Sequence, residues 1–110
     1  MNQNPYLKAL TFVQKNRGTS SQAALAKCIL SVYNRDHSFS IGEVLGPLDQ
    51  EYSDVVVAML NEYARHGETA ELRRAGEYVY DNFPRLIELS NAMSDARYSV
   101  HKEWRRRDDE

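Results

Sequence analysis

The sequence predicts an all-α fold, a compact single-domain bundle of four to five helices. Apolar residues recur at helical spacing over most of the chain, and helix-capping residues precede several of these segments. No alternating apolar and polar stretch is long enough to indicate a sheet. A chain of 110 residues has room for one core. We therefore expect a single helical domain over 1–103 and a charged, flexible C-terminal tail over 104–110.

The first two helices are predicted on either side of Gly18. Asn4 can cap the first helix, and Pro5 suits its first position, where the missing backbone N–H costs nothing. Gly18 is expected to end this helix in the left-handed conformation. Thr19 and Gln22 then form a capping-box pattern for a second helix. The apolar stripes of the two helices are Tyr6, Leu7, Leu10 and Val13 in the first, and Leu25, Cys28, Ile29 and Val32 in the second.

Two more helices are predicted in the middle of the chain. Ser40 and Glu43 form a capping box before a short helix, which a Gly-Pro pair ends. Asp49 caps a longer helix that continues to about Arg65. The triplet Val55–Val57 is β-branched, but the helical spacing around it and the cap outweigh this preference for a strand. The apolar face of the longer helix consists of Tyr52, Val56, Met59, Leu60 and Tyr63.

The last third of the chain is predicted less uniformly. The segment 69–82 stays open between a short helix and a loop, because Gly76 weakens a helix. A last helix begins near Pro84 and is expected to fray beyond Val100. Its apolar residues have the 3-4-3-4 spacing of a helix-pairing seam: Leu86, Leu89, Met93, Ala96 and Val100. We expect the second, the fourth and the last helix to form the core.

Charge is unevenly distributed along the sequence. The first 34 residues contain four basic residues and no acid, whereas residues 35–95 contain twelve acids and five basic residues. A folded domain with this layout is expected to have one positive and one negative face, which would steer a charged partner. The basic candidates for partner binding are Lys8, Lys15, Arg17 and Lys27, and the acidic candidates are Asp49, Glu51 and Asp54.

These charges also have simpler explanations. Basic residues on a helix are commonly a solvated face, and acids at the start of a helix complement its dipole. Tyr78 and Tyr80 lie near Phe83 in the sequence and are candidates for a tyrosine-rich contact patch. The same three residues would serve equally well as a lid over the core.

No residue pattern indicates catalysis, a metal site or a bound cofactor. Cys28 is the only cysteine and falls on an apolar stripe, and it has no zinc-ligand spacing to His37, His66 or His101. The chain has neither a nucleophile elbow nor a phosphate-binding glycine loop. No apolar run is long enough to cross a bilayer, and the first residues do not resemble a signal peptide. We therefore expect a cytoplasmic protein that is not an enzyme.

Several segments within residues 21–93 together carry a resemblance: Ala24–Asn34, Phe39–Val44, Leu48-Asp49 with Asp54, Ala64–His66 and Phe83–Leu86. In these segments the chain resembles a family of small uncharacterised proteobacterial proteins, which are described only as a domain of unknown function. Members of this family are often carried on phages, plasmids and integrative elements. The resemblance implies an α-helical accessory protein of a mobile element and implies no catalytic residues.

The function predicted from these observations is a non-enzymatic accessory or adaptor protein that binds another protein. In a mobile-element setting, the protein could be an inhibitor of a host defence complex. The alternative is a nucleic-acid-associated factor that uses the basic face of the first two helices. The identity of the partner stays open, and both a monomer and a homodimer are compatible with the seam of the last helix.

Overall fold

The first five helices are each capped at the amino end by a side chain. The Oδ1 atom of Asn4 accepts hydrogen bonds from the backbone N–H groups of Tyr6, at 2.9 Å, and Leu7, at 3.3 Å. In the next four helices, the cap accepts from the backbone N–H three residues ahead. Each bond satisfies a donor that the start of a helix leaves unpaired. These four caps are Thr19, Ser40, Asp49 and Thr69.

The computed structural model describes residues 3–108, and the regular secondary structure in this range is entirely α-helical. The helices are α1 (Pro5–Lys15), α2 (Ser20–Tyr33), α3 (Ile41–Leu45), α4 (Gln50–His66), α5 (Ala70–Asn82) and α6 (Pro84–Asp108). The all-α prediction is therefore confirmed. Six helices are described instead of the expected four to five, because the segment left open between helix and loop forms α5.

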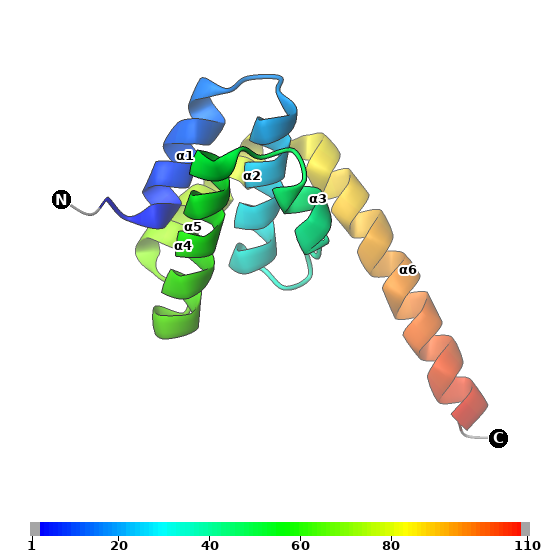
Figure 1. The fold of residues 1–110 in the computed structure, drawn as a ribbon. Helices are drawn as coiled ribbons and strands as arrows, with labels where there is room; N and C mark the ends of the chain where they lie inside the picture. The colour runs from blue at the N-terminus through cyan, green and yellow to red at the C-terminus, as the bar shows by residue number, and fades with distance from the viewer. Residues whose placement is uncertain (1–2, 109–110) are drawn as a thin grey trace.

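The core lies between α1, α2, α4 and α5, with α2 in contact with all three of the others and with α3 (Figure 1). Fully burying a large apolar side chain stabilises a protein by about 1.5–3 kcal/mol. Burial on these four helices therefore holds the bundle together, because helices of this length are marginal on their own. The large apolar side chains with no accessible surface are Tyr6, Val13, Leu25, Ile29, Leu30, Val56, Met59, Leu72 and Val79.

Helices α2 and α5 pack tightly at Gly76. A Cβ atom at position 76 would lie 2.3 Å from Cγ of Tyr33, which is far inside van der Waals contact. The missing side chain therefore leaves space for the Tyr33 ring on the face of α5. The glycine that made this helix uncertain in the sequence is required by its packing.

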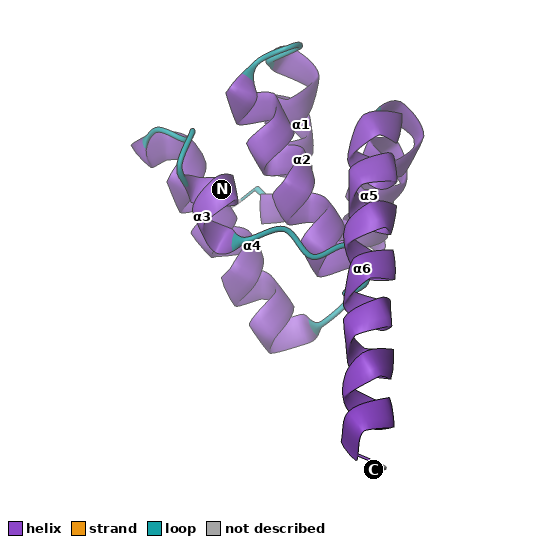
Figure 2. Ribbon diagram, turned by 90° about the vertical axis from the view of Figure 1, so that its right-hand side faces the viewer, coloured by secondary structure: helices purple, strands orange, loops and turns teal. Residues whose placement is uncertain are grey.

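Helix α6 projects from the bundle, as Figures 1 and 2 show. The molecule is 58 Å long but only 31 and 25 Å across. Within α6, Ser90 is the one buried residue, while Leu86, Ile87 and Met93 are half-buried against the core. The prediction that the last helix forms the core with the second and fourth is wrong, because α1 and α5 fill that place.

Several predicted details of the helices differ from the structure. Helix α1 ends at Lys15, so Gly18, with φ of 77°, lies in the turn after the helix. The Gln22 side chain accepts a hydrogen bond from the backbone N–H of Gly18 at 2.9 Å and donates one to the carbonyl of Val13 at 2.6 Å. Gln22 therefore stabilises the turn after α1 and does not complete the predicted capping box. On α4, Val55 is buried, whereas Leu60 and Tyr63 of the predicted apolar face are exposed.

The C-terminal segment is helical further than expected. Helix α6 continues past Val100 to Asp108, with a run of three arginines in its last turn. Positive charge is favourable in the last turn, because it complements the negative carboxyl end of the helix dipole. The flexibility predicted for 104–110 stays a prediction, and residues 109–110 lie outside the described range.

Replacing Gly76 by alanine is expected to destabilise the protein by about 1–3 kcal/mol. Alanine has a helix propensity about 1 kcal/mol better than glycine, but overpacking against the Tyr33 ring outweighs this gain. Urea denaturation followed by circular dichroism measures the change. Gly42→Ala is the matched control, because a Cβ atom at this position in α3 meets nothing within 4 Å. A Gly76→Ala variant as stable as Gly42→Ala would show that α2 and α5 can separate at no cost.

Candidate protein-interaction surface

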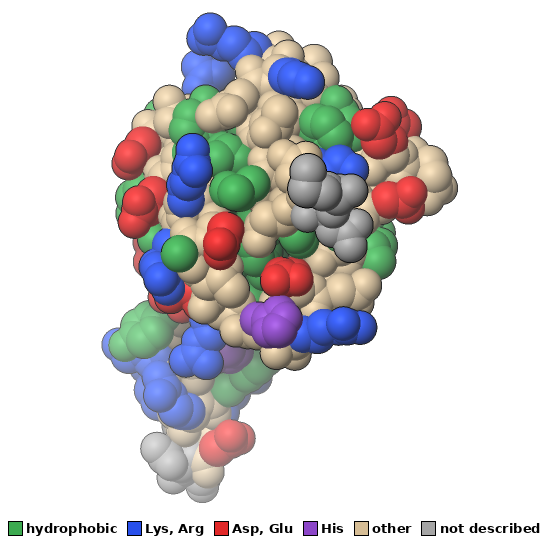
Figure 3. Space-filling model, turned by 90° about the vertical axis from the view of Figure 1, so that its left-hand side faces the viewer, with side chains coloured by type: hydrophobic (Ala, Val, Ile, Leu, Met, Phe, Trp, Pro, Cys, Tyr) green, Lys and Arg blue, Asp and Glu red, His purple; other side chains and the backbone are tan. Residues whose placement is uncertain are grey.

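The predicted positive and negative faces are not separate in the structure. Lys8 of α1 lines the same surface hollow as Glu51 and Asp54 of α4. Helices α1 and α4 pack side by side, so the basic start of the chain lies against its acidic middle. Figure 3 shows basic and acidic side chains interspersed over this face of the molecule. The expectation of one positive and one negative face is therefore wrong here.

The three acidic candidates are at the start of α4, and each of them has a local structural role. Asp49 is the cap, and its Oδ1 accepts the backbone N–H of Tyr52 at 3.0 Å. Asp54 accepts a hydrogen bond from the Gln50 side chain at 2.7 Å. Glu51 lies in the first turn, where negative charge complements the helix dipole. Helix formation therefore accounts for all three acids without a partner.

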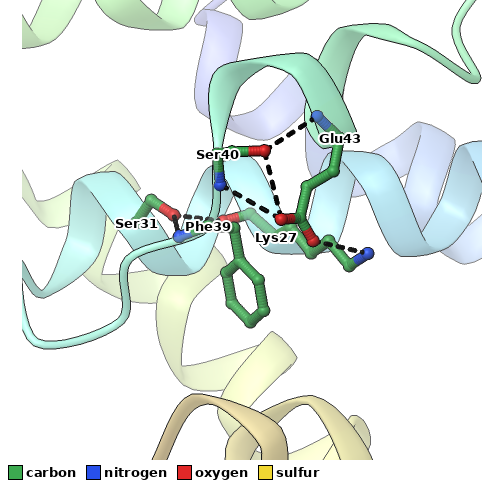
Figure 4. Close-up of polar contacts among 5 residues, drawn as sticks. All are labelled: Lys27, Ser31, Phe39, Ser40 and Glu43. Carbon is green, nitrogen blue, oxygen red and sulfur yellow. Dashed lines mark hydrogen bonds and ion pairs between the residues drawn. The ribbon is translucent and has the colours of Figure 1, made fainter. Parts of the chain in front are cut away.

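Lys27 joins α2 to α3, as Figure 4 shows. Its Nζ lies 3.1 Å from Oε1 of Glu43 and 5.7 Å from the centre of the Phe39 ring. The other carboxylate oxygen of Glu43 accepts the backbone N–H of Ser40 at 3.3 Å, which completes the predicted capping box. The hydrogen bond from Lys27, followed by that from Ser40, holds the pKa of Glu43 below its ordinary value of 4.5. Lys27 is therefore engaged in an internal ion pair.

The remaining basic candidates lie near the carboxyl end of α1. Arg17, in the turn after α1, lines a polar hollow together with Tyr78, Asn82 and Phe83 from the end of α5. Lys15 is exposed in the last turn of α1, where it complements the helix dipole. The structure thus brings Arg17 and Tyr78 together, and it places Lys8 and Lys27 elsewhere.

Tyr78 and Tyr80 do not form one patch. Residues two apart on a helix point in directions about 200° apart. Tyr78 lines the hollow with Arg17, whereas the Tyr80 ring meets the ring of His37 edge-on, with centroids 5.9 Å apart. The predicted tyrosine-rich surface around both residues is therefore wrong.

The reactive side chains singled out in the sequence do not converge. Cys28 is 3 % exposed, and burial raises the pKa of its thiol to about 12, so the thiolate form is disfavoured at neutral pH. His37 is buried, while His66 and His101 are exposed. Within residues 3–108, no three histidine, cysteine, aspartate or glutamate side chains form a group that could hold a metal ion.

The base of α6 is fixed to the loop between α2 and α3. Nδ1 of His37 lies 2.7 Å from Oγ of Ser90, and both side chains are buried. About two helical turns further along α6, Nη1 of Arg97 donates to Oγ of Ser38 at 2.9 Å. Ser90 and Arg97 are seven residues apart, so they lie on the same side of α6. These two contacts set the direction in which the rest of the helix projects.

The other sides of α6 carry exposed apolar residues. Leu89 is 46 % exposed, Val100 46 % and Trp104 51 %, and together with Met93 and Ala96 they form one stripe along the helix. Tyr98, 63 % exposed, lies on a different side. The 3-4-3-4 spacing predicts most of this stripe as a helix-pairing seam, which the sequence leaves open between the domain's own core and a second copy. The sequence did not indicate that Trp104 belongs to the stripe.

A smaller apolar hollow lies between α2, α3 and α4. Its volume is about 310 Å³, and Ile41, at 57 % exposure, stands at its edge. The side chains of Leu60 and Tyr63, predicted to be in the core, line it instead. Its other apolar lining residues are Cys28, Val32, Phe39 and Val44.

Comparisons with known proteins give no match: no family model, no curated protein and no solved structure is similar to this chain. Among residues 3–108, no helix combines the length and the apolar character needed to cross a membrane. The resemblance to the mobile-element family therefore stays a prediction. The contact element proposed below is supported by the geometry of the surface.

Ser90→Ala is expected to destabilise the protein by about 1–3 kcal/mol, because it leaves the buried Nδ1 of His37 without a partner. Chemical denaturation measures this change. Ser99→Ala is the control, since Ser99 is exposed on the same helix and the substitution should change stability by less than about 0.5 kcal/mol. Equal stabilities of the two variants would argue against His37 as the anchor of α6.

The ion pair of Glu43 predicts a dependence of stability on pH. The folded-state pKa of Glu43 is lowered, so its stabilising effect is complete above pH 4.5 and is lost as the pH falls through the folded-state value. The wild type should therefore exceed Glu43→Gln in stability at pH 7 by less than about 1 kcal/mol, because the pair is partly exposed. Thermal unfolding at pH 7 and pH 3 checks this. A difference that grows towards pH 3 would have the wrong sign.

Proposed function

We propose that this protein is a non-enzymatic accessory or adaptor that binds another protein chain, and that α6 is its contact element. The observation that carries the proposal is the exposed apolar stripe of a helix that projects from its own domain. Contiguous exposed apolar residues mark interaction sites, and an amphipathic helix is a common recognition element.

The way α6 is anchored supports this role. Its first turns are fixed to the bundle through Leu86, Ile87 and Ser90, so the direction of the helix is defined before a partner binds. Such pre-organisation lowers the entropic cost of association. Trp104, a residue type enriched in binding hot spots, stands in the free half of the helix, where its ring lies 5.2 Å from that of His101.

The resemblance to proteins of mobile elements suggests the setting of this role. In that setting, the partner would be a component of a host defence complex, and the protein would be its cytoplasmic inhibitor. Nothing in this role requires a cofactor or a catalytic group.

The nucleic-acid alternative has less support from the geometry. It relies on Lys8, Lys15, Arg17 and Lys27 as one basic face. Lys27 is paired with Glu43, and Lys8 stands beside Glu51 and Asp54. A phosphate backbone would meet carboxylates at both places, which opposes binding.

An affinity pull-down from lysate of the source cells tests the proposal. The bait is compared as wild type, Val100→Glu and Tyr98→Glu, each with nuclease and at low and moderate salt. We expect a stoichiometric protein that survives nuclease and salt, is retained by Tyr98→Glu and is lost with Val100→Glu. Both substitutions add a charge to an exposed apolar position of α6, but only Val100 belongs to the stripe.

Other outcomes would oppose the proposal. Recovery of nucleic acid that is lost at moderate salt would favour the nucleic-acid alternative. Equal capture by the wild type and Val100→Glu would show that α6 is not the contact element.

A further inference from the structure

We infer that the stripe of α6 binds a second copy of this chain, with the two α6 helices antiparallel and related by a two-fold axis. This inference rests on the proposed function, because it takes α6 to be the contact element. It goes further by naming a second copy, in place of a host component, as the molecule bound by the stripe, and by giving the arrangement of the complex.

The bundle covers the stripe only in part, because Met93 packs against the core whereas Leu89, Val100 and Trp104 are exposed. Leu89 and Ala96 each precede by one residue a position that contacts the bundle, Ser90 and Arg97. One residue turns an α-helix by about 100°, so the stripe faces to the side of the bundle. The carboxyl-terminal half of α6 extends away from the other helices (Figures 1 and 2). A cover for this exposed part of the stripe would therefore come from another molecule.

The charges along α6 and the end of α5 would be complementary to those of a second copy that runs in the opposite direction. Residues 77–95 contain four acids and one basic residue, whereas residues 97–107 contain five basic residues and one acid. In an antiparallel pair, the basic residues 97–107 of one copy lie beside the acidic residues 77–95 of the other copy. A parallel pair would place like charges together. A single two-fold axis satisfies both contacts, as expected for an isologous dimer.

The sizes of the side chains also fit this arrangement. Helix α6 has 25 residues and is therefore about 37 Å long. Its midpoint is Ala96, a small residue that allows the two helices to approach closely where they cross. With the axis at Ala96, Val100 of one copy lies opposite Ala92 of the other. Leu89 then lies within one residue of the partner's Trp104.

The dimer is expected to be weak. The seam includes Ala96 at its centre, and Glu103 takes the next position of the repeat after Val100, so less apolar surface is buried than in a seam of leucines. We therefore expect association at micromolar concentrations and a monomer on strong dilution.

Sedimentation of the purified full chain tests the inference. At high micromolar concentration the wild type should have twice the 12.7 kDa mass of one chain. Val100→Glu should have the mass of one chain, and Tyr98→Glu should still dimerise, because Tyr98 points about 200° away from Val100. Far-ultraviolet circular dichroism checks that each variant is folded. A wild type with the mass of one chain would overturn the inference.

Cysteine cross-linking tests the antiparallel order independently of these variants. Ala96→Cys lies near the axis, so the Cys side chains of the two copies should form a disulfide with each other under mild oxidation. Glu103→Cys lies far from the axis and should not form this disulfide. Cys28 is 3 % exposed and does not compete. Self-linking of Glu103→Cys with equal efficiency would indicate a parallel pair and overturn the arrangement.

The two proposals can fail separately. A monomer whose Val100-dependent pull-down captures a different protein overturns the dimer and keeps the protein-binding function. A monomer with no Val100-dependent partner overturns both.

Discussion

The burial of α2 among α1, α4 and α5 is the constraint on which the rest of the structure depends. Leu25, Ile29 and Leu30 have no accessible surface, and Leu30 lies about 100° around the helix from Ile29. A helix that is apolar on more than one side must be surrounded. The other helices are therefore arranged around α2, and the Gly76–Tyr33 contact shows how closely α5 must approach it.

The position of α2 also determines where the exposed helix begins. The loop that follows α2 places His37 under α6, and its hydrogen bond to Ser90 fixes the base of that helix. The next residues lead to α3, which the Lys27–Glu43 pair holds against α2. Lys27 in the middle of α2 thus positions α3, and the loop at the end of α2 positions α6. The direction of α6 is a consequence of the core.

Local features were predictable from the sequence, and long-range packing was not. The caps at Asn4, Ser40 and Asp49 act over three residues, and the structure contains each of them. Gly76 shows the limit of such reasoning, because helix propensity counts against the glycine while the ring of Tyr33, 43 positions away, requires it. The same limit applies to Lys8, which is far from Glu51 in the sequence and beside it in the fold. Charge segregation along a chain does not predict segregation on the surface when the two segments pack together.

The candidate surface illustrates a further physical limit. Apolar residues at spacings of three and four define one side of a helix, and this side must be covered for the helix to be stable. The spacing does not specify whether the cover comes from the same chain or from another molecule. In this fold, Ser90 determines which side of α6 faces the bundle. Its buried hydroxyl group contacts His37, whereas the neighbouring Leu89 is exposed. If Leu89 faced the bundle in its place, Leu89 would be covered by the core. The rotation of about 100° between adjacent residues therefore decides which side of the base of α6 is covered.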